Sequence, residues 1–371
     1  MRTPHGLLVS ACLLLAVASP LAAPAGAATP GTVGGDRLAE RGLVLPLGGP
    51  ALPAVAASSW LVADLDTGDV LASRNPHGRF APASTLKTLT AETLIPKLDP
   101  HAQVVPTFDD VNVDGSKVGL VEHVKYPISQ LFTAMLVVSG NDAANTLATA
   151  NGGVPKTVTE MNAEAARLQA FDTHAVNANG LDDPSQLSSA YDLALIARAG
   201  MQLPAFRDYV KTKHSQIRGP RGRAIFISSH DKLLYNYDGA IGIKNGYTVR
   251  ARATFVGAAT RNGHTLVVTL MHTNPRYWPE AAALLDWGFR AKASGVEAVG
   301  QLVDPVNPDQ QSQGTVQAAP VRPSAAKITL AQDKGLPLLP TAIVAGGVLV
   351  IATSLLRSRR GRRRRLSLPK L

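Results

Sequence analysis

The period of the hydrophobic pattern changes twice along the chain. Residues 58–76 carry two alternating apolar runs around the turn sequence Asp-Thr-Gly-Asp, which predicts a β-hairpin. The middle of the chain has apolar residues at helical spacing and predicts helices at 128–139, 141–150, 155–169 and 189–201. Alternation returns in 239–273, where Asn262-Gly263 marks a hairpin turn, and 278–290 predicts a closing helix with Pro279 near its first position.

This order of elements predicts a fold of the α/β class in the α+β arrangement. Strands from both ends of the chain are expected to form one antiparallel sheet, because they flank a block of helices instead of alternating with them. The helices then flank the sheet, and those in the middle of the chain form a helical subdomain. The sequence shows no internal repeat that would indicate another architecture.

The start of the chain has the pattern of a secretory signal peptide. Met1-Arg2 is followed by a largely apolar run at 7–18, and Ala25 and Ala27 form a small-residue cleavage site. We therefore predict a signal peptide at 1–28. Its removal also removes Cys12, the only cysteine, and so excludes disulfides, a thiol nucleophile and cysteine metal ligands. A lipoprotein box ending at Cys12 is disfavoured, because the apolar run continues beyond it.

The end of the chain predicts a membrane anchor. Residues 336–356 contain no charged side chain, and at about 1.5 Å rise per residue they span roughly 30 Å, the thickness of the bilayer core. Residues 357–371 hold seven Arg and one Lys, which supply eight of the ten net positive charges. This asymmetry predicts a single-pass cell-membrane protein with a basic cytoplasmic tail and an extracytoplasmic body. It argues against nucleic-acid binding; a buried core helix with a solvated tail is the alternative.

Composition divides the remaining chain into three parts. With 371 residues and 45% hydrophobic content, the protein is long enough for one large domain or two small ones. We predict a leader or linker at 29–57, rich in Gly, Pro and Ala, one domain at 58–292, and a flexible tether at 293–335.

The segment Arg-Phe-Ala-Pro-Ala-Ser-Thr-Leu-Lys, at 79–87, carries a candidate nucleophile. Ser84 precedes a helical run and Lys87 follows three residues later, so both side chains share a face. Ser84 could be only a helix N-cap and Lys87 a solvated first-turn residue, since serine is a preferred cap. Alternatively the two residues are a nucleophile and its base.

Two further motifs favour the catalytic interpretation. Ser139-Gly140-Asn141 has the form Ser-x-Asn and joins two predicted helices, while Lys244-Asn245-Gly246 is close to Lys-Thr-Gly and lies on a predicted strand. Each alone could be an ordinary helix end or turn. Together with Ser84-x-x-Lys87, their order and context match the signature of β-lactamases and penicillin-binding proteins.

The physical chemistry of these residues agrees with that signature. A serine hydroxyl needs a neighbouring base at neutral pH, and no histidine here lies in a triad-like motif. Lys87 can act as the base when it is neutral, which burial and the nearby cation of Lys244 both favour. Backbone N–H groups at a helix start stabilise negative charge that develops near Ser84, and Gly246 allows the strand to approach a substrate closely.

Residues 58–290 resemble the serine-type D-alanyl-D-alanine carboxypeptidases, the low-molecular-mass penicillin-binding proteins. Besides the three motifs, 58–87 is similar to that family's opening hairpin and nucleophile segment. Residues 158–183 resemble its Met-Asn helix and Gly-Leu-Asp turn, and 232–248 its run into the third motif. The resemblance implies a β-lactamase/transpeptidase-like fold without metal or cofactor. The implied partners are the stem pentapeptide of peptidoglycan as substrate and β-lactam antibiotics as covalent inhibitors.

The resemblance also implies roles for the site residues. Ser84 would be the acyl-ester nucleophile and Lys87 the general base, with Ser139 relaying a proton to the leaving amine and Asn141 holding Lys87 and the substrate amide. The backbone N–H groups of Ser84 and Tyr247 would form the oxyanion hole. Lys244 would bind both Ser139 and the terminal carboxylate of the substrate. Substrate binding would also involve Asn245, Gly246 and Thr248.

Two positions depart from the family pattern. Asn245 stands where the family usually has threonine, whose hydroxyl contacts the substrate carboxylate, so the substrate preference is open. Arg252 stands where the family often has glycine; we expect it to face solvent instead of pairing with a carboxylate. The second, β-rich domain of some members is absent from this sequence, and the tether takes its place.

Two other functions fit the motifs. A class A β-lactamase needs a glutamate that activates the deacylating water. The acids near a suitable helix, Glu160 and Glu164, flank the Met-Asn element instead, as in carboxypeptidases. A membrane-tethered β-lactam or cell-wall sensor, which is acylated but turns over poorly, would show the same three motifs.

Overall fold

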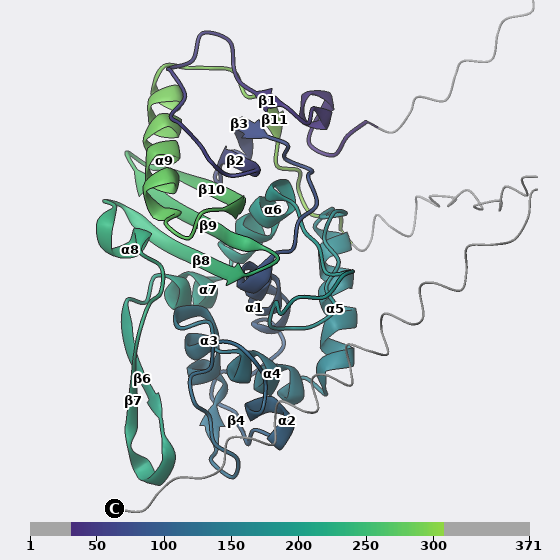
Figure 1. Cartoon of the computed structure of the whole chain (residues 1–371), viewed down its shortest axis with the longest axis vertical. Coiled ribbons are helices and arrows are strands. Elements are labelled where there is room, and N and C mark those ends of the chain that lie inside the picture. Colours follow the sequence, from purple (N-terminus) through teal and green to yellow (C-terminus); the bar gives the residue numbers. More distant parts are fainter. Residues whose placement is uncertain (1–30, 308–371) are drawn as a thin grey trace, which may run out of the picture. The chain divides into compact units, whose positions relative to one another are not determined.

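The computed structural model describes residues 31–307, and its centre is an antiparallel sheet (Figure 1). Seven strands belong to this sheet, in the order β1-β3-β2-β10-β9-β8, with β11 pairing with β3. Their bounds are Leu43–Val44 (β1), Ser59–Asp64 (β2), Asp69–Arg74 (β3), Ala240–Thr248 (β8), Arg252–Arg261 (β9), His264–Thr273 (β10) and Gly300–Gln301 (β11). The sheet therefore joins strands from both ends of the sequence, as predicted.

Both predicted hairpins are present. β2 pairs with β3, and β9 pairs with β10 through a turn in which Asn262 and Gly263 have φ angles of 50° and 78°. Left-handed conformation at both central positions is what a tight hairpin turn of this type requires. The sheet is covered on both faces: Trp60 and Val62 of β2 pack with the closing helix, and Leu61 and its neighbours pack with the helical subdomain.

The predicted helices form with ends shifted by a few residues at most. The structure has helices at Lys87–Leu94 (α1), Phe108–Val111 (α2), Ile128–Val137 (α3), Asn141–Ala150 (α4), Val154–Arg167 (α5), Ala190–Gly200 (α6), Pro204–Val210 (α7), Leu233–Asn236 (α8) and Trp278–Ala293 (α9), and 3-10 turns at Asp36–Ala39 (η1), Ala83–Leu86 (η2) and Pro220–Gly222 (η3). Ser189 caps α6 through the N–H of Asp192, and Pro279 lies in the first turn of α9. α6 packs on one face of the sheet and α9 on the other.

Two short strand pairs were not predicted. β4 (Gln103–Val104) pairs with β5 (Tyr126–Pro127), and β6 (His214–Arg218) pairs with β7 (Ala224–Ser228). β6 and β7 form a hairpin that projects from the body of the domain (Figure 1). Its strands carry many polar residues and bury few side chains, so the sequence shows only a weak strand signal there.

The folded part extends beyond both boundaries expected from composition. β1 lies within the predicted linker at 29–57, and Trp287 Nε1 donates to the carbonyl oxygen of Pro50 at 2.9 Å. β11 lies within the predicted tether, so the tether does not begin at residue 293. Composition misplaced these limits because a two-residue edge strand needs only backbone hydrogen bonds, which any sequence can supply.

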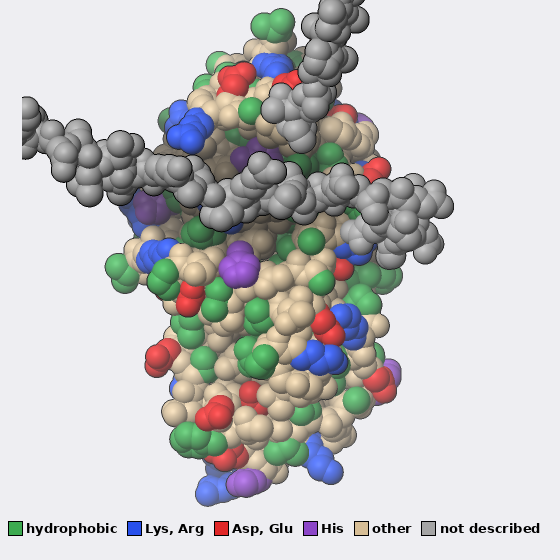
Figure 2. All heavy atoms as spheres, turned by 90° about the vertical axis from the view of Figure 1, so that its right-hand side faces the viewer, with side chains coloured by type: hydrophobic (Ala, Val, Ile, Leu, Met, Phe, Trp, Pro, Cys, Tyr) green, Lys and Arg blue, Asp and Glu red, His purple; other side chains and the backbone are tan. Residues whose placement is uncertain are grey.

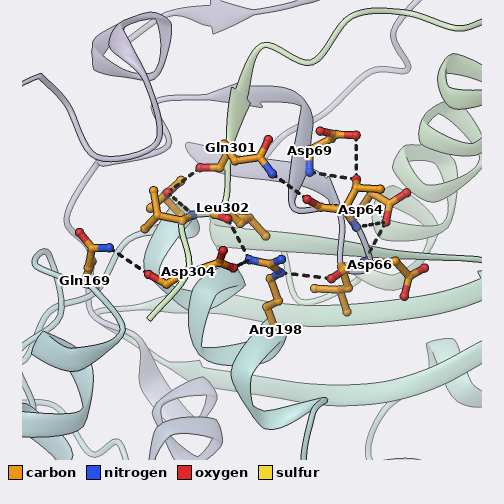
Figure 3. Close-up of polar contacts among 12 residues, drawn as sticks. Asp64, Asp66, Asp69, Gln169, Arg198, Gln301, Leu302 and Asp304 are labelled. Carbon is orange, nitrogen blue, oxygen red and sulfur yellow. Dashed lines mark hydrogen bonds and ion pairs between the residues drawn. The ribbon is translucent and has the colours of Figure 1, made fainter. Parts of the chain in front are cut away.

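Arg198 of α6 and Gln169, which follows α5, hold the segment that follows α9 (Figure 3). Arg198 Nη1 donates to the carbonyl oxygen of Leu302 and to Asp304 Oδ1, both at 2.9 Å. Gln169 Nε2 donates to the carbonyl oxygen of Asp304 at 3.0 Å, and the backbone N–H of Gln301 donates to the carbonyl oxygen of Gly34 at 2.8 Å. The first and last described segments are thus bonded to each other.

Within residues 31–307, no helix is both long enough and apolar enough to cross a membrane. The predicted signal peptide at 1–28, the membrane span at 336–356 and the basic tail at 357–371 lie outside the described residues. On the face shown in Figure 2, acidic and basic side chains are interspersed.

Candidate active site

Ser84 lies in the 3-10 turn η2, immediately before α1, which begins at Lys87. Neither helix start has a side-chain cap, so the structure excludes the interpretation of Ser84 as an N-cap. Lys87 is fully buried, whereas Ser84 is partly exposed. Their side chains meet, with Lys87 Nζ 2.9 Å from Ser84 Oγ. A reactant can therefore reach the hydroxyl, but solvent cannot reach the amine.

Lys87 Nζ has two further neighbours, and both accept hydrogen bonds. Asn141 Oδ1 lies 2.7 Å from the amine, and the backbone carbonyl oxygen of Asn179 is its second acceptor. A neutral amine has two hydrogens and one lone pair. It can donate both hydrogens to Asn141 and Asn179, which leaves the lone pair facing the hydroxyl of Ser84. The geometry is that of a base aimed at a nucleophile.

Burial and charge favour this neutral form. Burial lowers the pKa of Lys87 well below its usual value, and the nearby cation of Lys244 lowers it further, whereas the carboxylate of Asp142 opposes the shift. No carboxylate within residues 31–307 forms an ion pair with Lys87. The site therefore favours an amine that is ready to accept a proton.

The start of α4 orients the amide of Asn141. Its Nδ2 donates to the carbonyl oxygen of Asp114 at 2.6 Å, which leaves Oδ1 for Lys87. Asp142, next in the helix, accepts hydrogen bonds from the backbone N–H groups of 118–120. One helix start thus fixes both the lysine and the loop at 114–120.

Ser139 lies between α3 and α4 in a left-handed conformation, with φ of 63°. Ser139 is buried, and within residues 31–307 its hydroxyl makes no hydrogen bond. The structure places it in the connection that leads to Asn141, as the motif requires. Its hydroxyl is therefore available to a substrate group.

The third motif lies on β8, against the nucleophile turn. A Cβ atom on Gly246 would lie 2.6 Å from the backbone nitrogen of Ser84, so only glycine lets the strand pass this close. Thr254 of β9 donates to the carbonyl oxygen of Pro82 at 2.8 Å and ties the sheet to the same turn. Tyr247 follows Gly246 and has an exposed side chain.

Lys244 is buried, and its Nζ donates to the carbonyl oxygen of Asn245 at 2.9 Å. Burial lowers the pKa of Lys244 to about 7, although the nearby carboxylate of Asp231 acts in the other direction and raises it. Within the described part of the chain, no hydrogen bond joins Lys244 to Ser139. The direct link between these residues that the resemblance implies is not made in this structure.

The other third-motif residues differ in their surroundings. Asn245 is partly buried, and Thr248 Oγ1 donates to Asp182 Oδ1 at 2.8 Å. Arg252 is exposed and donates to the amide oxygen of Asn274 at 3.0 Å, not to a carboxylate, as expected. Thr248 thus joins the end of β8 to the loop that contains Asn179.

Sequence reasoning missed three residues of this site. Asn179 contributes a backbone oxygen, which no side-chain pattern can show. Gly180, at φ of 83°, approaches so closely that a Cβ there would lie 2.1 Å from the carbonyl oxygen of Ala83. Asp231 is buried beside Lys244, and burial raises its pKa to about 7, although Lys244 opposes the shift. An acidic residue two positions before the apolar Leu233-Leu234 pair was the available signal.

Neither glutamate considered for a β-lactamase lies at the nucleophile. Glu160 accepts hydrogen bonds from Asn151 Nδ2 and pairs with Lys97, both at 2.8 Å. Both oxygens of Glu164 accept from Arg167 Nε at 2.9 Å. These carboxylates stabilise α5 and its surroundings, and neither contacts Ser84.

Two clusters of His and Asp side chains in residues 31–307 are close enough to share a metal ion. They are Asp64, Asp66 and His264, and His77, Asp172 and Asp192. Neither includes a residue of the candidate site. Asp64 already pairs with Lys292, and His77 bonds to Asp172 and to the carbonyl oxygen of Val33.

The fold and the site together define the class of protein as a serine peptidase. The sequence profile of the D-alanyl-D-alanine carboxypeptidases, which are serine peptidases, matches residues 49–274. The chain belongs to this family, and its fold is that of the penicillin-binding DD-peptidases.

Characterised relatives agree with this assignment. The chain is 44% identical over 253 residues to the D-alanyl-D-alanine carboxypeptidase DacB2 of Mycobacterium tuberculosis, covering 66% of this chain and 87% of DacB2. A crystal structure of a D-alanyl-D-alanine carboxypeptidase from Mycobacterium tuberculosis has a TM-score of 0.67 and 43% identity, over 70% of this chain and 99% of that one. The Streptomyces K15 DD-transpeptidase has a TM-score of 0.62 and 28% identity, over 65% and 99%.

Proposed function

We propose that the protein removes the terminal D-alanine from peptidoglycan stem pentapeptides through an acyl-enzyme on Ser84. The observation that carries this proposal is the contact of Lys87 Nζ with Ser84 Oγ at 2.9 Å, with hydrogen-bond acceptors at the other two contacts of the amine. β-Lactams acylate proteins of this family, and we propose Ser84 as the residue that they modify here.

Acylation begins with proton transfer from Ser84 to Lys87. As the proton leaves, Ser84 Oγ attacks the carbonyl carbon between the two D-alanines and forms a tetrahedral oxyanion. The backbone N–H groups of Ser84 and Tyr247 donate to this oxyanion. The close approach of Gly246 to the nitrogen of Ser84 supports this assignment, because it brings β8 beside the nucleophile.

The leaving D-alanine needs a proton on its nitrogen. We assign this transfer to Ser139, whose buried hydroxyl has no hydrogen-bond partner in the described part of the chain, with Lys87 returning the proton that it accepted. Asn141 holds Lys87 and contacts the substrate amide. Water then hydrolyses the ester and releases the shortened peptide.

Lys244, Asn245, Gly246 and Thr248 form the proposed site for the terminal carboxylate of the substrate. Lys244 has a pKa of about 7 in the free protein because it is buried. An incoming carboxylate favours the protonated amine and would raise this pKa. Substrate binding and protonation of Lys244 are therefore coupled, and the cation forms where the negative charge arrives.

The decisive experiment is a turnover assay on a soluble pentapeptide ending in D-Ala-D-Ala. Steady release of D-alanine, many equivalents per enzyme and blocked by penicillin, supports the carboxypeptidase. A sensor would be labelled by penicillin but would release at most about one equivalent. Hydrolysis of penicillin at a comparable rate would instead indicate a β-lactamase.

We also propose that the protein is exported and is anchored in the cell membrane by residues 336–356. The uncharged run and the seven arginines after it support this topology. The catalytic domain is then extracytoplasmic, where peptidoglycan is found, and residues 357–371 are cytoplasmic.

Removal of everything after Gly335 is expected to release the domain from the membrane as active protein, because the truncated chain lacks the apolar span. Cell fractionation with penicillin labelling measures this. The matched control ends after Leu356 and keeps the span but loses the basic tail. A shorter chain that stayed in the membrane fraction would contradict a single C-terminal anchor.

Asn245→Ala is expected to lower kcat/KM for peptides ending in D-Ala-D-Ala by about tenfold or more. Asn offers two amide donors, and a hydrogen bond to a charged group contributes roughly 1.5–3 kcal/mol. The loss should be smaller on a substrate with an amidated C-terminus, and Asn245→Thr should keep most of the activity. Equal losses on free-acid and amidated peptides would show that Asn245 supports β8 and does not bind the carboxylate.

A further inference from the structure

The hairpin β6–β7 concentrates positive charge. Residues 211–230 contain no acidic side chain, and their cations are Lys211, Lys213, Arg218, Arg221 and Arg223. The face shown in Figure 2, in contrast, mixes both signs of charge. The hairpin projects from the domain, so most of these cations are exposed (Figure 1).

A cavity of about 580 Å³ lies between this hairpin and α3. Its polar lining consists of Gln130 from α3 and Gln216, Arg218 and Arg223 from the hairpin, and none of the residues that line it is acidic. The backbone N–H of Arg218 donates to Gln130 Oε1 at 2.9 Å, which fixes the hairpin against the helix. We call this cavity the hairpin groove.

The two arginines that line the hairpin groove form no ion pair within the described part of the chain. Lys211, near the base, is paired with Asp208 at 2.6 Å. Within residues 31–307, neither Arg218 nor Arg223 has a carboxylate within ion-pair distance; Arg218 Nη1 donates only to the carbonyl oxygen of Lys125. A guanidinium binds carboxylates with two parallel hydrogen bonds. The groove is therefore complementary to a ligand with carboxylate groups.

The neighbouring surface favours a glycan polymer over a lipid bilayer. Phe226 is 81% exposed and pairs across the hairpin with Gln216, next to the groove. Ile217 and Ile227 are buried, so Phe226 is the only large apolar side chain of β6 and β7 that is widely exposed. Membrane-surface elements need a broad apolar face to insert. A single aromatic ring instead offers a surface on which one sugar ring can pack.

The hairpin groove is connected to the active site through α3. Gln130 lies roughly 10 Å along the helix from Val137, the last residue of α3. Val137 accepts a backbone hydrogen bond from His230 at 3.1 Å, and Ser139 follows it two residues later. A polymer in the groove therefore lies near the residues that would process one of its peptides.

We propose that the hairpin groove binds a neighbouring segment of the substrate polymer, a glycan strand whose peptides carry free carboxylates. This inference rests on the proposed function and specifies its substrate as polymeric peptidoglycan. The groove holds the strand while Ser84 acts on a stem peptide nearby.

The test compares Arg223→Gln with Arg221→Gln in the full chain. Both changes remove one charge from the same hairpin, but Arg221 does not line the groove. Arg223→Gln is expected to lower kcat/KM on isolated peptidoglycan by about twofold to fivefold at low salt, with little change on a short soluble pentapeptide. Arg221→Gln should have a smaller effect, and high salt should remove the difference.

Equal losses for the two variants would overturn the proposal, because they would indicate diffuse charge and not a groove. It would also be overturned if Arg223→Gln weakened binding to vesicles of anionic phospholipid but left turnover of peptidoglycan unchanged. A wild-type chain that released no D-alanine from the short peptide would refute the proposed function. Cosedimentation of Ser84→Ala chains with peptidoglycan, with and without Arg223→Gln, would still decide the role of the groove.

Discussion

Ser84→Ala is expected to abolish both D-alanine release and covalent labelling by a fluorescent penicillin. Ser84 Oγ is the group that Lys87 contacts at 2.9 Å, and without it neither reaction has a nucleophile. The rate should fall on the order of 10⁴-fold or more. Gel fluorescence after penicillin treatment and a D-alanine assay measure the two losses, and thermal unfolding checks that the fold is intact.

Ser185→Ala is a matched control for this variant, because it removes the hydroxyl of an exposed serine in the described part of the chain. It should keep full labelling and full turnover. Labelling that persisted in Ser84→Ala would place the nucleophile elsewhere and would refute the mechanism proposed for Lys87.

Gly180→Ala is expected to cost more than about a hundredfold in turnover, although residue 180 has no chemical role. Its φ of 83° is unfavourable for alanine, and the new Cβ would lie 2.1 Å from the carbonyl oxygen of Ala83. The turn that carries Ser84 must then move, and a displacement of about 1 Å can reduce a rate about 10²-fold. Steady-state kinetics on a pentapeptide and the rate of penicillin acylation should fall together.

Gly263→Ala is the control that separates displacement of the Ser84 turn from the backbone strain of a left-handed alanine. Gly263 has a similar φ of 78° but no atom within 4 Å of the position of a Cβ. Both variants should lose about 1–2 kcal/mol of folding free energy from the left-handed conformation. Only Gly180→Ala should lose activity. Similar kinetics in the two variants would show that the turn at Ser84 tolerates the displacement.

Much of the fold could be predicted because its elements have strong periodic patterns. The helix beginning at Asn141 and the turn at Asn262-Gly263 are local features, set by residue spacing and turn chemistry. β1 and β11 could not be predicted, since each has two residues and depends on hydrogen bonds to a distant partner, β3. The hairpin β6–β7 was missed because its strands are half polar and exposed.

The candidate site likewise contains residues that the sequence predicted and contacts that it could not predict. Ser84, Lys87 and Asn141 were found because their side chains belong to short motifs, and the structure brings the three together. The second acceptor of Lys87 is a backbone oxygen of Asn179, which residue identity cannot reveal. The resemblance implied that Lys244 binds Ser139, but whether they meet depends on how the connection between α3 and α4 packs against β8, which no local pattern determines.

The hydrogen bond between the N–H of Gln301 and the carbonyl oxygen of Gly34 makes the domain a candidate for circular permutation. The first and last described segments of the domain lie side by side, so a short linker could close the polypeptide into a ring. New termini could then open in the exposed turn of residues 220–223, which contains none of the three motifs. Such a rearranged chain would carry its attachment point at the tip of the β6–β7 hairpin.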